Sequence, residues 1–394
     1  MQTINPMPIP LKLSVLRLVY AHPLYARHLI EKKFRFRRRF RRIAKCPDKD
    51  NAVLPPLVYK FILTLRCNLN CRMCMLWGER GWCKKEPRDT TSGELDWDIV
   101  KRIVSQSGHY RPSYILSGGE PLLYSHFEDL AESLGKTRSF AYICTNGLLL
   151  DRFKDTISKN PYLTFLVSLD GLRDENDSLR GKGVYDKVVE NISLLKAIKR
   201  PPYIGIQFTI YPDNVAIMYD FCREMARLKI DWILLNPCWF ISETQAKEYE
   251  SVMVNDFGVR PKTHSGYLSV PDFDKEEFVK QLRKIRDRSW PMQVSCYLKE
   301  PEHVYTYADT PEVPPGNGFC YKQWLRLDIA PDGEVCPCIQ FPDLKFGNLK
   351  EKSALEIWNS PSYERFRKIL RKRCLPVCSK CDCLYLYDAG RKYL

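Results

Sequence analysis

The stretch "LRCNLNCRMCMLWG", residues 65–78, places three cysteines within eight residues, at positions 67, 71 and 74. It follows the apolar run "LVYKFILTL", which has the composition of a buried strand. The chain of 394 residues holds 16 cysteines and shows no secretion signal, so we expect a reducing compartment. Clustered thiols in such a compartment more often bind metal than form disulfides. The loop is therefore a predicted metal site.

Short apolar runs alternate with helical patterns from about residue 57 onward, and this alternation predicts repeated βα units around a parallel sheet. Six such units predict an α/β fold, a partial (β/α)6 TIM-like barrel rather than the usual eight units. Functional residues of such folds lie beyond the carboxyl ends of the strands. We expect one shared rim for five residues that each follow a strand-like run: Cys67, Gly118, Asn146, Ser168 and Cys238.

The chain divides into three expected regions. Residues 1–55 form a basic amphipathic extension, residues 56–310 the core domain, and residues 311–394 a small C-terminal domain. A proline-rich stretch, "EPEHVYTYADTPEVPPGNG", marks the second boundary. Residues 240–270 show no clear hydrophobic period, so we predict a loop insertion there that lies near the rim and covers substrate.

The net charge of +15 is concentrated in the first 45 residues, which hold twelve Lys or Arg against one acid, Glu31. Because Leu, Val, Tyr and Phe are interspersed there, residues 10–45 predict a helix that contacts an anionic membrane surface. A helix packed on the core domain and an arm that binds nucleic acid are the alternatives, the latter least favoured. No apolar run is long enough to span a bilayer, so we expect a cytoplasmic protein, with peripheral attachment to the inner face of the membrane.

The spacing C-x3-C-x2-C puts three thiolates on one tight loop. Three thiolates can hold three irons of a cubane iron–sulfur cluster and leave the fourth iron open to an outside ligand. Zinc is the alternative, although a structural zinc site usually takes four protein ligands.

This loop resembles that of the radical S-adenosylmethionine (radical SAM) enzymes. The resemblance implies that a [4Fe–4S] cluster on Cys67, Cys71 and Cys74 binds S-adenosylmethionine at its open iron. Three later stretches agree with it: "SGGEP" resembles the motif that receives the methionine amino group, and "TNG" and "SLDG" stand where the family contacts ribose and carboxylate. Arg180 also resembles a recurring family position. The implied cofactor-binding residues are Gly118, Gly119, Glu120, Asn146, Ser168, Asp170 and Arg180.

Two positions leave room for other roles. Met73 stands where the family commonly has an aromatic residue against adenine, and its thioether can cover the same ring. Asp170 is explained nearly as well by an Asp-Gly turn. On the fifth strand-like run, Gln207 and Thr209 have the parity to point into the barrel together.

The C-terminal region resembles the SPASM/twitch extension of radical SAM enzymes. Cys320, Gly333 and Cys338 have the spacing C-x12-G-x4-C, and a CxxC pair, Cys378 and Cys381, follows. The chain ends thirteen residues after Cys381, which fits the shorter twitch arrangement. The resemblance implies one auxiliary [4Fe–4S] cluster on these four cysteines, without assigned roles for Cys336, Cys374 and Cys383. A zinc ribbon is the alternative.

The resemblance implies an enzyme that cleaves S-adenosylmethionine to a 5′-deoxyadenosyl radical, which then abstracts a substrate hydrogen atom, with flavodoxin or ferredoxin as electron donor. Two outcomes stay open: oxidation through the auxiliary cluster, and epimerisation with Cys238 returning the hydrogen, although Cys238 can equally be a core residue. The extension looks too short for a leader-binding domain, so we favour a sugar, aminocyclitol or lipid-linked glycan substrate.

The alternative within the same chemistry is an enzyme that modifies a ribosomal peptide. The alternative of another class is a zinc-stabilised, non-enzymatic adaptor that binds membrane or RNA. It does not explain why the cysteine loop and the three later motifs follow successive strand-like runs.

Overall fold

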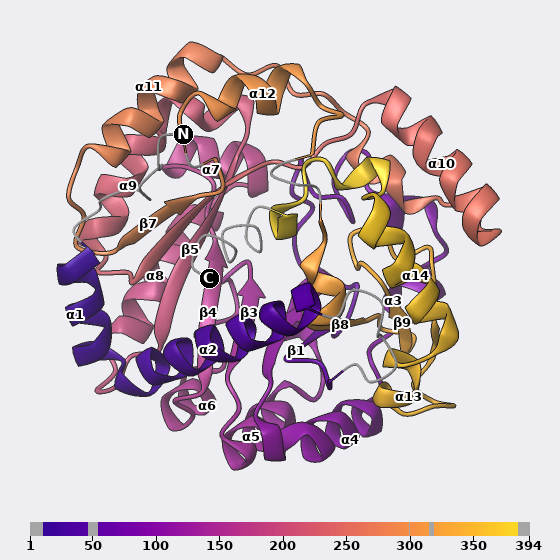
Figure 1. Cartoon of the computed structure of the whole chain (residues 1–394). Helices are drawn as coiled ribbons and strands as arrows, with labels where there is room; N and C mark the ends of the chain where they lie inside the picture. Colours follow the sequence, from indigo (N-terminus) through magenta and orange to yellow (C-terminus); the bar gives the residue numbers. More distant parts are fainter. Residues whose placement is uncertain (1–10, 46–53, 299, 315–318, 385–394) are drawn as a thin grey trace.

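The structure is a computed structural model that describes residues 11–45, 54–298, 300–314 and 319–384 (Figure 1). Its strands form one sheet with the order β10-β9-β8-β1-β2-β3-β4-β5-β6-β7. The six expected strands are parallel neighbours: β1 (Val58–Ile62), β2 (Ser113–Ser117), β3 (Ala141–Thr145), β4 (Leu163–Ser168), β5 (Tyr203–Ile210) and β6 (Trp232–Pro237). The expected α/β class with a partial parallel barrel is confirmed.

Two further parallel strands extend this unit. β7 (Gln293–Cys296) pairs with β6, and β8 (Arg326–Ile329) pairs with β1. β8 lies in the region that we expected to form a separate C-terminal domain, so that region shares the core sheet.

Helices cover the outer face of the sheet because alternate strand residues point toward them. In β1, Tyr59 and Phe61 are buried in the main core, whereas Lys60 belongs to the opposite face. The helices that follow the strands present apolar residues at three- and four-residue spacing, as Met218, Phe221 and Met225 do in α9. The outer helices are α4 (Trp97–Ser107), α5 (Phe127–Thr137), α6 (Lys154–Lys159), α7 (Arg173–Arg180), α8 (Val184–Lys196), α9 (Met218–Arg227) and α11 (Lys275–Arg286).

The loop expected at residues 240–270 is wrong for about half of its length, which α10 (Glu243–Phe257) occupies. Ser242 and Gln245 form a capping box that starts this helix, and Gly258 ends it in the left-handed region at φ 69°. Only Gln245, Ala246, Tyr249 and Met253 are buried on α10. Such a narrow apolar stripe is weak evidence in the sequence, which is why the helix was missed.

The basic extension folds into α1 (Leu11–Ala21) and α2 (Pro23–Lys45), and α2 crosses the amino-terminal ends of the strands (Figure 1). His22, between the two helices, lies 3.1 Å from Asp231, one residue before β6. Tyr25 packs on Phe140 and Tyr203, at the starts of β3 and β5. Arg39 is buried and donates to the carbonyl oxygens of Leu54, Pro55 and Trp324, which precede β1 and β8.

These contacts confirm the alternative of a helix packed on the domain, at least for the inner face of α2. In the described residues, no helix is long and apolar enough to cross a membrane.

The C-terminal region adds an antiparallel pair and two helices to the edge of the sheet. β9 (Glu334–Cys336) pairs with β8 through the expected turn at Asp332 and Gly333, and β10 (Gly347–Asn348) pairs with β9. α13 (Ala354–Trp358) and α14 (Pro361–Lys372) follow. The shorter elements are α3 (Arg88–Ser92), α12 (His303–Asp309) and the 3-10 turns η1 (Trp82–Lys85), η2 (Gly108–Tyr110), η3 (Pro121–Leu123), η4 (Pro212–Ile217), η5 (Thr263–Tyr267), η6 (Tyr321–Trp324) and η7 (Pro376–Cys378).

Candidate active site

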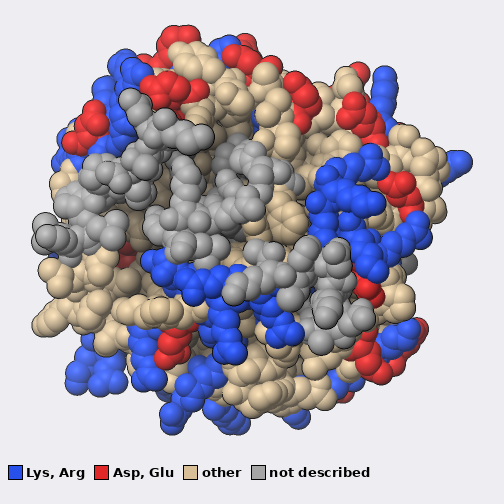
Figure 2. Space-filling model, viewed as in Figure 1, with Lys and Arg blue, Asp and Glu red and all other residues tan. Residues whose placement is uncertain are grey.

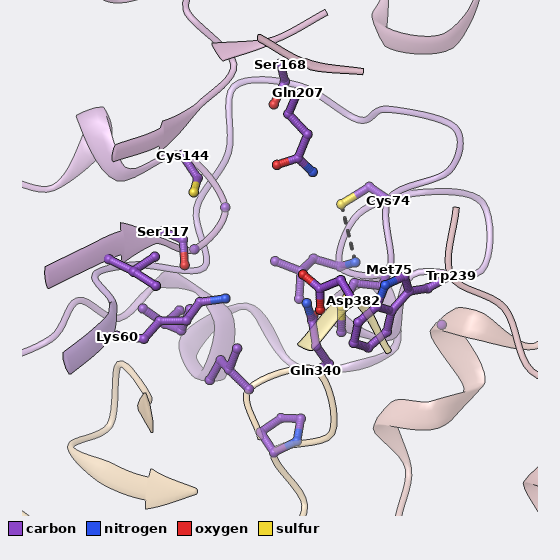
Figure 3. A pocket seen from close by; sticks show the side chains of 18 of the residues that line it. Lys60, Cys74, Met75, Ser117, Cys144, Ser168, Gln207, Trp239, Gln340 and Asp382 are labelled. Carbon is purple, nitrogen blue, oxygen red and sulfur yellow. Dashed lines mark hydrogen bonds between the residues drawn. The ribbon is translucent and has the colours of Figure 1, made fainter. Parts of the chain in front are cut away.

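The cysteine loop follows β1, and an N–H group approaches each of its three sulfur atoms. Asn146 Nδ2 lies 4.0 Å from Cys67 Sγ, and Arg180 Nη1 lies 3.7 Å from Cys71 Sγ. The backbone nitrogen of Leu76 lies 3.4 Å from the sulfur of Cys74, which Figure 3 labels. N–H donors stabilise thiolates and tune the iron–sulfur clusters that thiolates hold.

Two of the loop thiols, Cys67 and Cys71, are not thiolates by themselves. Burial raises the pKa of Cys67 to about 12, and burial also raises the pKa of Cys71. Metal ions that displace the protons would leave thiolates, whose negative charge these N–H donors match. Three such sulfurs on one loop fit a cluster with one open iron.

The predicted "GGE" motif brings the backbone after β2 against the cysteine loop. A Cβ atom on Gly118 would lie 2.2 Å from the carbonyl oxygen of Thr64, and its φ is +147°, so only glycine fits there. The next residue but one, Glu120, is fully buried. Its carboxylate accepts hydrogen bonds from Leu122 N, Thr145 Oγ1 and Asn146 N at 2.7–3.0 Å. Glu120 therefore fixes the "TNG" turn next to the cysteine loop.

Arg180 and Asp170 form a buried ion pair behind the loop. Arg180 Nη2 lies 2.5 Å from Asp170 Oδ2, and Thr209 N donates to the other carboxylate oxygen at 2.6 Å. Asp170 is fully buried and does not line the cavity described below, so the structure places it behind Arg180 rather than in the expected contact with ribose. Its carboxylate positions Arg180 against Cys71.

The remaining predicted residues line one cavity of about 1770 Å³ that the strands surround. Met73, Gly118, Gly119, Asn146, Ser168 and Arg180 contribute to its wall, as do the three loop cysteines. Gln207 and Thr209 also face it, which confirms their predicted inward parity. Figure 3 shows Ser168 and Gln207 pointing into this space from neighbouring strands.

Cys238 lines the same cavity just beyond β6. It is 6% exposed, its carbonyl oxygen accepts a 2.7 Å hydrogen bond from Tyr307, and burial raises its pKa strongly. Cys238 therefore carries a neutral S–H group, the form from which a hydrogen atom can be donated.

The C-terminal cysteines gather around a buried charged group. Lys322 Nζ and Arg326 Nε lie 2.8 Å and 2.7 Å from the carboxylate of Asp328, which is fully buried. Arg326 also reaches Cys383 Sγ at 3.7 Å. Burial raises the pKa of Cys320 and Cys338, while the nearby charge of Lys322 opposes that shift in both. Lys322 and Arg326 are thus two cations beside several thiols, which suits an anionic cluster.

The sequence analysis missed the place of Cys383 and Cys374. The ligand atoms of Cys381, Asp382 and Cys383 lie within 4.8 Å of one another. Cys374 is hydrogen-bonded to Cys378 and shifts the pKa of that thiol upward. The spacing "CSKCDC" held the signal, because a C-x-C pair next to a CxxC pair places a third thiol close by. Asp382 and Cys383 line the main cavity, so the C-terminal cysteines reach it (Figure 3).

Two family models match the chain. The model described as the radical SAM superfamily matches residues 61–225, and the model described as an iron-sulfur cluster-binding domain, SPASM, matches residues 320–382.

Three curated relatives are similar over most of the chain. GTP 3′,8-cyclase of Clostridium perfringens is 31% identical over 325 residues, which cover 79% of this chain and 87% of the relative. The tungsten-containing aldehyde ferredoxin oxidoreductase cofactor-modifying protein of Pyrococcus furiosus is 24% identical, over 81% of this chain and 85% of the relative. The antilisterial bacteriocin subtilosin biosynthesis protein AlbA of Bacillus subtilis is 24% identical, over 86% and 67%.

The structure of SuiB from Streptococcus suis, bound to S-adenosylmethionine, has the same fold. It aligns with a TM-score of 0.60 and 19% identity, and covers 82% of this chain and 70% of SuiB. The fold, the matched domains and the relatives together account for a cysteine loop after the first strand and a second cysteine group beside the same cavity. The chain belongs to the radical SAM superfamily, as an enzyme of the SPASM type whose cofactors are S-adenosylmethionine and [4Fe–4S] clusters.

Proposed function

We propose that this enzyme modifies a peptide. The observation that carries the proposal is the similarity to proteins named for peptide modification. The cavity of about 1770 Å³ exceeds the about 300–1,000 Å³ of usual small-molecule pockets, which leaves room for S-adenosylmethionine beside a substrate. Similarity to AlbA, which is named for bacteriocin biosynthesis, supports the same substrate class, and SuiB has been solved bound to a precursor peptide. The preference for a sugar or glycan in the sequence analysis rested on the short, basic extension and on the family resemblance, and the relatives reported above do not support it further.

The cofactors supply a 5′-deoxyadenosyl radical through reductive cleavage of S-adenosylmethionine. The chain's own residues hold and orient them. Cys67, Cys71 and Cys74 would hold the cluster. Asn146, Ser168 and Arg180 would bind polar groups of S-adenosylmethionine, since all three face the cavity beside the loop. Gly118 and Gly119 would let the cofactor approach the backbone, and Met73 would cover the adenine.

Residues of the cavity wall outside the cysteine loop would determine the fate of the substrate radical after hydrogen abstraction. Asp382 and Cys383 place the auxiliary site at the cavity, where it would accept the second electron of an oxidation. Cys320, Cys338, Cys378 and Cys381 are the expected ligands of that auxiliary cluster, and Cys383, which lies against Cys381 and Arg326, would replace one of them. Cys238 offers the alternative, return of a hydrogen atom and epimerisation. The thiyl radical left on Cys238 would then take an electron that originates from the flavodoxin or ferredoxin donor, and a proton from solvent. An oxidation lowers the product mass by two hydrogens. An epimerisation in deuterated water replaces one hydrogen by deuterium, because the Cys238 thiol exchanges with solvent, so the product mass separates the two outcomes.

A deuterium-transfer experiment tests the substrate class. The anaerobically reconstituted enzyme would be incubated with S-adenosylmethionine, dithionite and either a perdeuterated peptide pool or a perdeuterated pool of sugars and aminocyclitols. The mass of the 5′-deoxyadenosine released reports which pool donated the hydrogen. We expect deuterium from the peptide pool only. Deuterium from the sugar pool alone would contradict the proposal, and Cys71→Ala is the control that should release no 5′-deoxyadenosine.

A second proposal concerns the outer face of the basic extension. Leu16, Tyr20 and Phe34 are 66%, 92% and 65% exposed, among many basic residues that Figure 2 shows as a blue band where α2 lies. This composition favours peripheral contact with an anionic membrane. Vesicles that contain phosphatidylglycerol should carry the wild type in a flotation assay, and Leu16→Glu/Phe34→Glu should not float.

A flavodoxin or ferredoxin would supply the electron for the reductive cleavage of S-adenosylmethionine.

A further inference from the structure

The amino-terminal end of the cavity is closed by α2 and is lined by cations. Lys32, Lys33 and Arg37 of α2 and Lys60 of β1 all contribute to the wall there. They share this end with aromatic side chains, namely Tyr25, Phe36, Phe40 and Tyr142. This region and the cysteine loop lie at opposite ends of the strands. α2 contacts residues at the starts of the strands, whereas the loop follows the end of β1.

Lys60 is the most unusual member of this group. It occupies a central position of a parallel strand, on the face that points into the barrel, where buried apolar residues are the rule. Figure 3 shows its amine extending into the cavity near Ser117. In the part of the chain that the structure describes, no carboxylate lies within 4.0 Å of this amine, and no hydrogen bond to it is formed.

Among the described residues, no carboxylate forms an ion pair with Lys60, Lys32 or Arg37. Asp328 lies opposite Lys60 on the neighbouring strand β8, but its carboxylate is paired with Lys322 and Arg326. Asp382 faces the cavity but lies beyond ion-pair distance of Lys60 in the described structure. The other acids of the wall lie toward the outer mouth, on the cysteine loop and on the segments after the strands: Glu79, Glu86, Glu94, Asp332, Glu334 and Asp343.

Two cations of α2, Lys32 and Arg37, also have N–H groups with which they could bind an anion. Among the described residues, Lys32 donates only to the hydroxyl of Tyr142, at 3.3 Å, and lies over that ring at 4.3 Å. The Nε atom of Arg37 is buried without a hydrogen-bond partner among the described residues. A buried N–H group without a partner is costly, and an anion would satisfy it.

We propose that Lys60, Lys32 and Arg37 form an anion subsite at the closed end of the cavity, which receives a carboxylate or phosphate group of the substrate. The subsite rests on the proposed function and narrows its substrate class, because it selects an acidic or phosphorylated peptide. Three cations in one enclosed, partly apolar space bind such a group more strongly than the same cations in water. The anionic group would anchor one end of the substrate while the rest extends toward the cysteine loop.

Calorimetric titration of the reconstituted enzyme tests the subsite with two probes, triglutamate for a carboxylate and pyrophosphate for a phosphate. We expect the wild type to bind at least one probe and Lys60→Met to bind it about 10-fold to 100-fold more weakly, as loss of a hydrogen bond to a charged group predicts. Lys60→Arg should restore most of the affinity, since it restores the charge. Lys350→Met is the matched control, because Lys350 is an exposed lysine that also borders the cavity.

Three results would overturn the proposal: binding of neither probe by the wild type, equal affinity in Lys60→Met at wild-type iron content, or equal losses in Lys60→Met and Lys350→Met. If Lys60→Met loses iron, Arg37→Gln on α2 decides, and unchanged affinity in that variant overturns the proposal. Because the readout is binding, an enzyme that binds triglutamate but takes deuterium only from sugars would contradict the peptide function and leave the subsite standing.

Discussion

Arg180 Nη2 lies 2.5 Å from Asp170 Oδ2, and the pair is almost completely withdrawn from solvent, with 10% and 0% of the two side chains exposed. The same guanidinium approaches Cys71 with its other terminal nitrogen. A buried carboxylate therefore sets the position of a cation beside a cluster-binding sulfur. Substitutions of Asp170 and of Cys71 therefore test the two sides of Arg180 separately.

Replacement of Asp170 by Asn should destabilise the protein and weaken its affinity for S-adenosylmethionine. The change leaves the charge of Arg180 buried without its partner, which costs about 3–5 kcal/mol in comparable pairs. Chemical denaturation measures the first effect and equilibrium dialysis the second. Asp151→Asn is the control, since Asp151 pairs with Lys187 at the exposed surface and its loss should change neither quantity. Equal stability of the two variants would contradict the role of the buried pair.

Replacement of Gly118 by Ala should destabilise the protein far more than replacement of Gly183. Both glycines have positive φ, +147° and +80°, but a Cβ atom on Gly118 meets the Thr64 carbonyl at 2.2 Å, whereas one on Gly183 meets nothing within 4 Å. We expect about 1 kcal/mol for Gly183→Ala and more than about 3 kcal/mol for Gly118→Ala. Denaturant midpoints measure both. Similar costs would mean that the backbone after β2 does not press on the cysteine loop.

Replacement of Cys71 by Ala should abolish cleavage of S-adenosylmethionine and remove one cluster. Two [4Fe–4S] clusters give about eight irons per chain, and the variant should retain about four. Iron analysis and chromatography of 5′-deoxyadenosine measure the two effects. Cys222→Ala is the matched control because Cys222 is fully buried in α9, away from both cysteine groups. Zinc in place of iron in the wild type would contradict the cluster assignment.

Replacement of Cys383 by Ala should lower the content of the auxiliary cluster without removing the first cluster. Cys383 lies against Cys381 and Arg326, whereas Cys336 Sγ points to the carbonyl of Asp328 at 4.0 Å. We therefore expect a larger iron loss in Cys383→Ala than in Cys336→Ala, by about four irons per chain. Mössbauer spectra of the two variants distinguish the clusters. The reverse order of iron loss would show that Cys336 is the ligand.

The stability of the folded protein should decrease as the pH is lowered, because Asp231 anchors the N-terminal helices. Burial alone would raise the pKa of Asp231, but the hydrogen bond from His22 and the charge of Lys196 lower it below its usual value. The depressed pKa stabilises the folded state above the unfolded pKa of about 3.9, and this stabilisation is lost as the pH falls from about 5 through the folded value. Denaturation curves should show a shallower pH dependence in Asp231→Asn. An unchanged slope would exclude Asp231 as the acid-sensitive anchor.

The local motifs predicted much of the fold and the site. The cysteine loop, "GGEP" and the inward parity of Gln207 are properties of neighbouring residues, so the sequence displays them directly. Contacts between distant segments are different. Nothing near Arg39 shows that its guanidinium is satisfied by Trp324, and nothing near Lys60 shows that α2 covers the space into which it points.

The two missed features have separate causes. On α10 the capping residues Ser242 and Gln245 were visible, but a mostly solvent-facing helix has too few apolar residues to display a period. Cys383 was visible as well, and only the folded arrangement of Cys381, Cys383 and Arg326 shows which thiols meet.

The pairing of β1 with β8 has a consequence for biosynthesis. During translation β1 leaves the ribosome first among the strands, and its neighbour on one side, β8, emerges only after the whole barrel has been made. Until then the strand that carries the cysteine loop has an unpaired edge, a feature that favours aggregation and binding by chaperones. Iron insertion into the nascent chain would therefore meet an incomplete site, and we expect cluster loading to follow release of the finished polypeptide.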